Sequence, residues 1–432
     1  MNFLKNKAQL VLRRIYRGHL LAHLPRVSEL YQEIEVPEET VKWITAQREV
    51  ITNILQGKDL RLLVIVGPCS IHDVRAGVEY TERLSVLHRK YHSQMYIVMR
   101  AYFEKPRTRQ GWKGLIVIPD LDDKYDVVKG IRYTHKCLVS ITALGVPTAT
   151  EFLDPFLAPY ISDLICWGAV GARTIESQPH RQIASGLRCP VGFKNSTNGN
   201  INLAIDSIIT ARDRHLLYMV NELGHVSVLL TEGNPHGHLI LRGDKQPNYT
   251  LNDITHAVEL MNEAGIYHHL IVDCSHDNSG KVAERQIHDV ISSRKIAPDY
   301  VAGIILESFL VEGKQSVKHP LAYGQSITDE YLSWQQTEQL LLELSKICQS
   351  VFVIDNSLDR DIQINFYRRG FTVKIIHNIE RPELDDILTL INNLPLLLLR
   401  IIICYFSSVT LSYPYSVFLP EICKQHYHRY TK

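Results

Sequence analysis

The stretch LLVIVGPCSIHD (residues 62–73) decides how the rest of the chain is interpreted. Its five leading apolar residues are typical of a strand buried on both faces, as in a parallel sheet. Glycine and proline follow at once, and Cys69, His72 and Asp73 come directly after them. Residues that can bind ligands are expected at the carboxyl end of a parallel strand that borders an active site.

The same pattern recurs along the chain. Short apolar runs alternate with stretches of helical periodicity, such as Gly77–Tyr91, Leu157–Trp167, Ile201–Ala211 and Ile254–Ala264. The runs are Leu62–Val66, Tyr96–Arg100, Pro147–Glu151, Ala169–Arg173, Val191–Lys194, Leu216–Val220, His269–Asp273 and Val301–Leu306. Eight strand–helix units over about 290 residues predict an α/β fold, a (β/α)8 TIM barrel. A doubly wound open sheet is the alternative, although no GxGxxG or P-loop motif opens any unit.

Three regions are expected. Residues 1–50 form an N-terminal extension for assembly or regulation, residues 51–349 form the catalytic barrel, and residues 350–432 form an atypical C-terminal appendage of unknown role. A hairpin of Val226–Thr231 and His238–Arg242 is expected after the sixth strand, because a turn sequence containing Gly, Asn and Pro separates the two runs.

The C-terminal appendage has a different texture. Residues 351–391 are compatible with a small βαβα unit whose first helix covers residues 361–369. The apolar tail Leu394–Phe406 contains Arg400 and has thirteen residues. A bilayer requires about 20 apolar residues, and a central Arg opposes insertion, so no membrane partner is expected.

Composition and charge exclude several classes. The chain has 432 residues, of which 45% are hydrophobic, so it is globular. Lys and Arg number 47 against 46 Asp and Glu, and no nucleic-acid partner is expected from so balanced a charge. The eight cysteines include no CxxC pair, which favours free thiols and a cytoplasmic location. Residues 1–28 hold six basic residues and no acidic one, which is compatible with a transit peptide or, preferably, a solvated basic helix.

Positive charge gathers after the predicted strands. Five cations converging on one barrel mouth would repel one another unless an anion lay between them. Because Arg forms bidentate contacts with phosphate and carboxylate, a small phosphorylated acid is the expected ligand. The five residues are Arg100, Lys105, Arg173, Lys194 and Arg242.

A second set of residues has metal-binding chemistry. Cys69, His276, Glu307 and Asp329 all follow predicted strands, and the barrel would bring them together. A thiolate, an imidazole and two carboxylates suit a divalent ion of the first transition row, with Mn, Fe, Co and Zn all compatible.

Beyond these patterns, the chain resembles the type I 3-deoxy-D-arabino-heptulosonate-7-phosphate (DAHP) synthase family over about residues 28–348. The segments that carry the resemblance are LLVIVGPCSIHD (62–73), MRAYFEKPRTRQGWKGLI (99–116), EFLDP (151–155), WGAVGARTIESQPHRQIASGL (167–187), CPVGFKN (189–195), LILRG (239–243), VDCSHDNSGK (272–281), ESFLVEGKQS (307–316) and LAYGQSITD (321–329).

The resemblance implies an activity. Members condense phosphoenolpyruvate with D-erythrose 4-phosphate and water, giving DAHP and inorganic phosphate, which is the first step of the shikimate pathway to chorismate and the aromatic amino acids. A homo-oligomer, dimer or tetramer, is expected. The alternatives are a synthase that uses arabinose 5-phosphate and a catalytically inactive regulatory homologue.

The resemblance also implies residue roles. The metal ligands match Cys69, His276, Glu307 and Asp329. The phosphoenolpyruvate-binding cations match Arg100, Lys105, Arg173, Lys194 and Arg242. The erythrose 4-phosphate side matches Arg107 and Thr108, and Lys113 is assigned to substrate binding. Proton transfer is expected from Lys105, His276 or Asp329, and Glu151 is expected to position the attacking water or to form a salt bridge with one of the cations.

Overall fold

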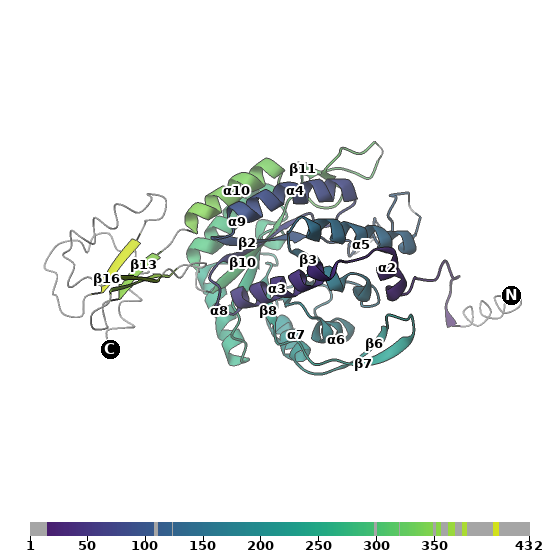
Figure 1. Ribbon diagram of the computed structural model, residues 1–432, viewed down its shortest axis with the longest axis horizontal. Coiled ribbons are helices and arrows are strands. Elements are labelled where there is room, and N and C mark those ends of the chain that lie inside the picture. Colours follow the sequence, from purple (N-terminus) through teal and green to yellow (C-terminus); the bar gives the residue numbers. More distant parts are fainter. Residues whose placement is uncertain are drawn as a thin grey trace, which may run out of the picture. The chain divides into compact units, whose positions relative to one another are not determined.

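The computed structural model describes residues 15–107, 111–122, 124–297, 300–318, 320–348, 351–355, 362–367, 374–377 and 401–405 (Figure 1). These residues fall into two compact units that divide near residue 350. Each unit is described by itself. The roles expected for the three sequence regions stay predictions.

Eight parallel strands close into a barrel in the first unit. They are β1 (Leu62–Gly67), β2 (Met95–Arg100), β3 (Thr148–Glu151), β4 (Trp167–Val170), β5 (Val191–Lys194), β8 (Gly237–Leu241), β9 (Leu270–Asp273) and β10 (Val301–Glu307). Strand β1 pairs with both β2 and β10, with Val64 opposite Ile97 and Ile304. This closure confirms the predicted TIM barrel and excludes the open sheet.

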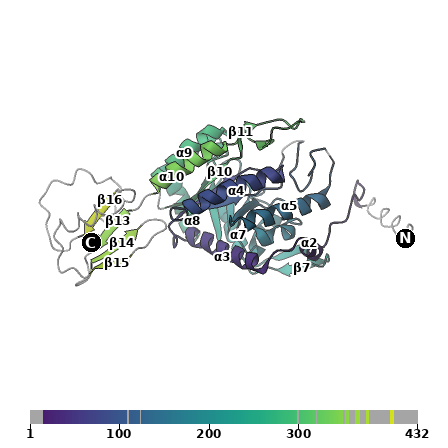
Figure 2. The same ribbon diagram turned by 45° about the horizontal axis from the view of Figure 1, so that its top comes forward.

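Helices surround the barrel, and both views place α9 and α10 side by side (Figures 1 and 2). They are α4 (Val74–Lys90), α5 (Val127–Ala143), α6 (Gln178–Gly186), α7 (Asn202–Arg212), α8 (Leu251–Glu263), α9 (Ala283–Ile296) and α10 (Trp334–Ile347). Local sequence fixes where several begin. The Asp73 carboxylate caps α4 by accepting from the backbone N–H of Arg75 at 2.9 Å. Capping boxes of Thr250 with Asp253 and of Ser333 with Gln336 start α8 and α10.

The helix predicted over Leu157–Trp167 is wrong. This connection contains two short 3-10 turns, η1 (Ala158–Tyr160) and η2 (Ser162–Leu164), and Trp167 already begins β4. Pro159 lies inside η1 and has no backbone N–H for an α-helical hydrogen bond. The short connection brings β4 beside β3, with Ala149 opposite Trp167.

The predicted position of the hairpin is also wrong. Leu216–Val220 is β6, and it pairs antiparallel with β7 (Val226–Leu230) in a sheet of their own. The sixth barrel strand is β8, which is buried along its whole length, whereas β6 and β7 are largely exposed. The two apolar runs β6 and β8 have equal length, and the barrel strand is β8, the one that is buried on both faces. The hairpin precedes the sixth barrel strand instead of following it.

The N-terminal region contains α2 (Val27–Glu33) and α3 (Glu38–Leu55). Ile44, Ile51 and Leu55 form the buried face of α3, which packs near β1. The basic helix expected over residues 1–28 is not present at residues 16–26, which are irregular. Residues 1–14 lie outside the described residues.

The second unit is a four-stranded sheet in the order β15-β14-β13-β16. Its strands are β13 (Val351–Asp355), β14 (Ile362–Tyr367), β15 (Lys374–His377) and β16 (Ile401–Tyr405). The helix predicted over 361–369 is wrong, because the alternation Ile-Gln-Ile-Asn-Phe has the period of a strand. Residues 382–391 and most of 394–406 lie outside the described residues. In the described part of the chain, no helix is long and apolar enough to cross a membrane.

Candidate active site

Three predicted metal ligands lie together at the carboxyl rim of the barrel. Glu307 ends β10 and pairs in register with Gly67 at the end of β1, and Cys69 follows two residues later. Asp329 lies in the segment after β12 (Gln325–Ser326). One ligand atom from each of Cys69, Glu307 and Asp329 lies within 4.8 Å of the others. We call these three residues the anionic cluster.

Two cations neutralise the anionic cluster. The Lys105 Nζ lies 2.6 Å from the Cys69 Sγ and 2.5 Å from an Asp329 carboxylate oxygen. Arg100 donates to the Glu307 carboxylate at 3.2 Å, and both side chains are almost wholly buried. The Arg100 guanidinium also lies 4.4 Å from the ring centroid of Tyr102. Each buried charge therefore has a partner, as burial requires.

Ionisation in the anionic cluster follows from burial and these partners. Burial raises the pKa of the Cys69 thiol to about 12, with Glu307 adding to the rise and Lys105 opposing it. Burial would also raise the pKa of Asp329, but the Lys105 ammonium outweighs it and holds that pKa at about 2. The Cys69 thiol thus requires additional positive charge to become a thiolate.

The fourth predicted ligand, His276, lies outside the anionic cluster. Its Nδ1 is 2.8 Å from a carboxylate oxygen of Asp273, the last residue of β9. The positive field of His276 nevertheless contributes to the low pKa of Asp329. A carboxylate on Nδ1 fixes the tautomer of a histidine and leaves Nε2 as the ligand or acid atom. Nε2 makes no hydrogen bond with the described residues.

The predicted anion-binding cations differ in their surroundings. Lys194 is buried, with its Nζ 2.9 Å from Asp273. Arg242 is also buried, and its Nη1 lies 2.7 Å from Asp277 without forming an aligned hydrogen bond. Arg100 keeps buried Nε and Nη1 atoms that have no hydrogen-bond partner among the described residues. Unused buried donors are costly, and an anionic ligand would satisfy them.

Other predicted substrate residues lie in solvent. Arg173 is exposed and donates to the Pro106 carbonyl at 3.1 Å. The exposed Arg107 donates through Nε to the Trp112 carbonyl at 2.8 Å. Lys113 is exposed, with its Nζ 5.4 Å from the Tyr125 ring centroid. No described contact joins these cations to the anionic cluster, and Thr108 lies outside the described residues.

The carboxylate predicted to position water, Glu151, ends β3 and is half-buried. A Cβ placed on Gly171 would lie 2.2 Å from Glu151 Oε1, so a larger residue at 171 would displace this carboxylate. Nearby Glu104 has its pKa raised to about 8, first by burial and then by the field of Asp154. Sequence reasoning missed Glu104, although it directly precedes Lys105.

Tyr331 is a second residue that sequence reasoning missed. Its hydroxyl accepts a hydrogen bond from the Cys69 backbone N–H at 3.0 Å and lies 2.6 Å from the Thr328 hydroxyl. It thereby joins the loop after β1 to the segment that carries Asp329. Nothing in the local sequence identified this contact, because 262 residues separate its partners.

Comparison with known proteins gives consistent results. The chain matches the family model described as the DAHP synthetase I family over residues 34–342. It is 51% identical over 308 residues to a protein of Enterobacter agglomerans named phospho-2-dehydro-3-deoxyheptonate aldolase, Trp-sensitive, covering 70% of this chain and 88% of the relative. A relative of the same name from Escherichia coli K12 is 47% identical over 330 residues, covering 75% of this chain and 95% of the relative.

A solved structure is similar as well. The phospho-2-dehydro-3-deoxyheptonate aldolase of Francisella tularensis SCHU S4 superposes with a TM-score of 0.74 at 40% sequence identity. The match covers 76% of this chain and 98% of that chain.

Proposed function

The chain belongs to the DAHP synthetase I family, and from that premise we propose that it condenses phosphoenolpyruvate with D-erythrose 4-phosphate and water, giving DAHP and inorganic phosphate at a metal-dependent site. The observation that carries the proposal is the anionic cluster at the barrel rim, with Lys105 and Arg100 against it. The enzyme class, an aldolase-type transferase, follows from the named relatives.

Phosphoenolpyruvate binding is assigned to the buried cations. Arg100 has guanidinium N–H groups without a hydrogen-bond partner among the described residues. Arg242 forms an ion pair with Asp277 that is not a hydrogen bond. Lys194 adds a point charge beside Asp273. A phosphate and a carboxylate on one small molecule match this set, because Arg binds such groups in bidentate geometry. Lys105 and Arg173 complete the assignment, and Arg173 donates to the carbonyl of Pro106, the residue after Lys105.

The anionic cluster fits a divalent ion of the Mn, Fe, Co or Zn type. Its donors are one thiol and two carboxylates, and the high pKa of Cys69 means that the thiolate forms readily only beside added positive charge. Cys69, Glu307 and Asp329 would hold the ion, with His276 as the fourth ligand through Nε2. Such an ion supplies Lewis-acid polarisation of the aldehyde of erythrose 4-phosphate.

The chain's own residues account for the proton movements. The methylene carbon of phosphoenolpyruvate attacks the aldehyde carbon, and we assign protonation of the resulting oxygen to the ammonium of Lys105. Water, positioned by Glu151, adds to the carbon that carries the phosphate and loses one proton to solvent. The bond from this carbon to the phosphate oxygen then breaks, the hydroxyl becomes the ketone, and its proton leaves with inorganic phosphate. Proton exchange with Lys105 is assigned to Asp329, whose carboxylate oxygen lies 2.5 Å from the Lys105 Nζ.

The proposal is tested by phosphate release from phosphoenolpyruvate with erythrose 4-phosphate or with arabinose 5-phosphate. We expect release with the four-carbon sugar only, loss after chelation and recovery with added Mn²⁺. Release with arabinose 5-phosphate alone would replace the proposed second substrate. No release with either sugar would favour the inactive homologue.

We also propose a homo-oligomer in which a second copy covers the hairpin β6–β7. Five exposed apolar side chains lie on one face of the hairpin, because they alternate along its two strands: Leu216, Tyr218, Val226, Val228 and Leu230. Light scattering should give twice or four times the chain mass, and Val226→Lys with Val228→Lys should reduce it. A monomeric wild-type protein would contradict this assignment.

A further inference from the structure

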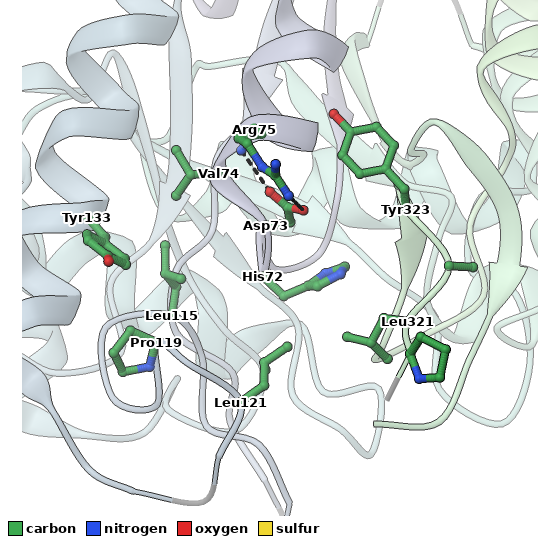
Figure 3. Close-up of a pocket in the computed structure, with 13 residues that line it drawn as sticks. His72, Asp73, Val74, Arg75, Leu115, Pro119, Leu121, Tyr133, Leu321 and Tyr323 are labelled. Carbon is green, nitrogen blue, oxygen red and sulfur yellow. Dashed lines mark hydrogen bonds and ion pairs between the residues drawn. The ribbon is translucent and has the colours of Figure 1, made fainter. Parts of the chain in front are cut away.

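A cavity of about 670 Å³ lies beside the start of α4 (Figure 3), and none of the residues assigned to the active site lines it. Residues 72–75, the loop 115–121 and the loop 320–324 form its walls, and Tyr133 of α5 closes one side. Ligand pockets typically enclose about 300–1,000 Å³, so the volume suits a small organic molecule.

His72 supplies a buried polar group that faces this cavity. The residue is only 8% exposed, and its ring packs edge-on against Trp112 and Phe309 with centroids 6.4 and 6.2 Å away. Its ring nitrogens make no hydrogen bond within the described parts of the chain, and Figure 3 shows the ring between the two loops. Burial lowers the pKa of His72, so the neutral imidazole offers one donor and one acceptor. A group from a ligand would satisfy them.

The mouth of the cavity favours a single negative charge. Asp73 is committed to capping α4, since one carboxylate oxygen accepts from the backbone N–H of Arg75 and Ala76. The Arg75 side chain is 86% exposed, and its Nη2 lies 3.8 Å from the other Asp73 oxygen, which is too long for a hydrogen bond. The 17-residue helix α4 adds partial positive charge at this end.

The rest of the cavity suits a flat apolar body. Leu115, Leu321 and the ring of Tyr133 line it. Tyr323 stands on the other side, held by a 2.8 Å hydrogen bond from its hydroxyl to Glu79. Leu121 reaches the cavity from a left-handed backbone conformation, with φ of 58°, which is strained for a branched residue.

We propose that this cavity binds an organic monocarboxylate with an aromatic or similarly flat body. The carboxylate lies toward Arg75 and the start of α4, a hydrogen bond joins the ligand to His72, and the body packs among Leu115, Leu321 and the two tyrosine rings. The exposed Arg75 donors and the start of α4 favour a carboxylate over an ammonium group.

Saturation-transfer NMR on the full chain tests the proposal with phenylacetate as the probe. Phenethylamine, which carries the same ring and the opposite charge, is the comparison ligand. Arg75→Gln should weaken phenylacetate binding about fivefold or more. Arg89→Gln, at the exposed far end of α4, is the matched control and should leave it unchanged. Leu321→Trp fills the cavity and should abolish phenylacetate binding. Its melting temperature should equal that of the wild-type protein.

Three results would overturn the proposal. These are equal binding of phenylacetate and phenethylamine, equal affinity in the Arg75→Gln and Arg89→Gln proteins, and undiminished binding to Leu321→Trp. Absence of phenylacetate binding to the wild-type protein at millimolar concentration would overturn it as well.

Discussion

The active-site mouth has two differently built halves. In the buried half, Arg100 and Lys105 lie against the anionic cluster at 3.2 Å or less. In the open half, Arg107, Lys113 and Arg173 lie in solvent and contact carbonyl oxygens or an aromatic ring. The buried half is therefore held rigid by mutual neutralisation, whereas cations of the open half are stabilised by water. The difference suggests that the first half is preorganised and the second is completed by substrate.

Breaking the buried half should have the largest effect on stability. Arg100→Met leaves Glu307 charged and without its buried partner, so we expect a loss of about 3–5 kcal/mol in the free energy of unfolding. Urea unfolding followed by tryptophan fluorescence measures it. Lys42→Met, which breaks an exposed pair with Glu38, is the control and should cost less than about 1 kcal/mol. Equal losses in the two variants would contradict the distinction between buried and exposed charge.

Removing the central ammonium should have the largest effect on activity. Lys105→Met takes away the group that lies between Cys69 and Asp329, and we expect kcat/KM to fall about 10²–10³-fold. Lys129→Met removes an exposed lysine that pairs with Asp120 and is the matched control. A loss below about tenfold in Lys105→Met would place the proton donor elsewhere.

The raised pKa of Glu104 predicts that the stability of the protein depends on pH. Its pKa is about 8 in the folded chain and near 4.3 when unfolded, so the folded state binds more protons between these values. Stability should therefore fall as pH rises from about 4 to about 8 and then level off. Glu104→Gln should melt higher than wild type at pH 8.5 and about equally at pH 4. A difference independent of pH would contradict the raised pKa of Glu104.

Changing the open half should have the smallest effect. Arg107→Gln removes an exposed side chain, so we expect no change in melting temperature and no change in KM for phosphoenolpyruvate. The KM for erythrose 4-phosphate should rise about tenfold, the value of one charge-assisted phosphate contact. A rise in both KM values would show that Arg107 contributes to phosphoenolpyruvate binding as well.

Sequence predicted the parts of this molecule that depend on local pattern. The apolar runs of β1, β2 and β10 predicted the barrel, and the residues at or after the ends of β1 and β10 predicted two members of the anionic cluster, Cys69 and Glu307. The sixth barrel strand was misplaced, because β6 and β8 are similar apolar runs and only burial on both faces separates them. The sequence did not predict the contact between Asp273 and His276, because the same residue pattern is compatible with His276 as a direct metal ligand. The hydrogen bonds of Tyr331 and the raised pKa of Glu104 depend on tertiary packing, which leaves no periodic pattern in the sequence.

Cobalt binding followed by absorption tests the central claim most directly. Titration of chelator-treated protein with Co²⁺ should produce a thiolate-to-cobalt charge-transfer band that saturates at one ion per chain, and phosphate release should rise with it. Cys69→Ser should lack the band and the activity, whereas Cys137→Ser, at a buried thiol in α5, should keep both. A band that survives in Cys69→Ser, or full activity of the metal-free protein, would contradict the account.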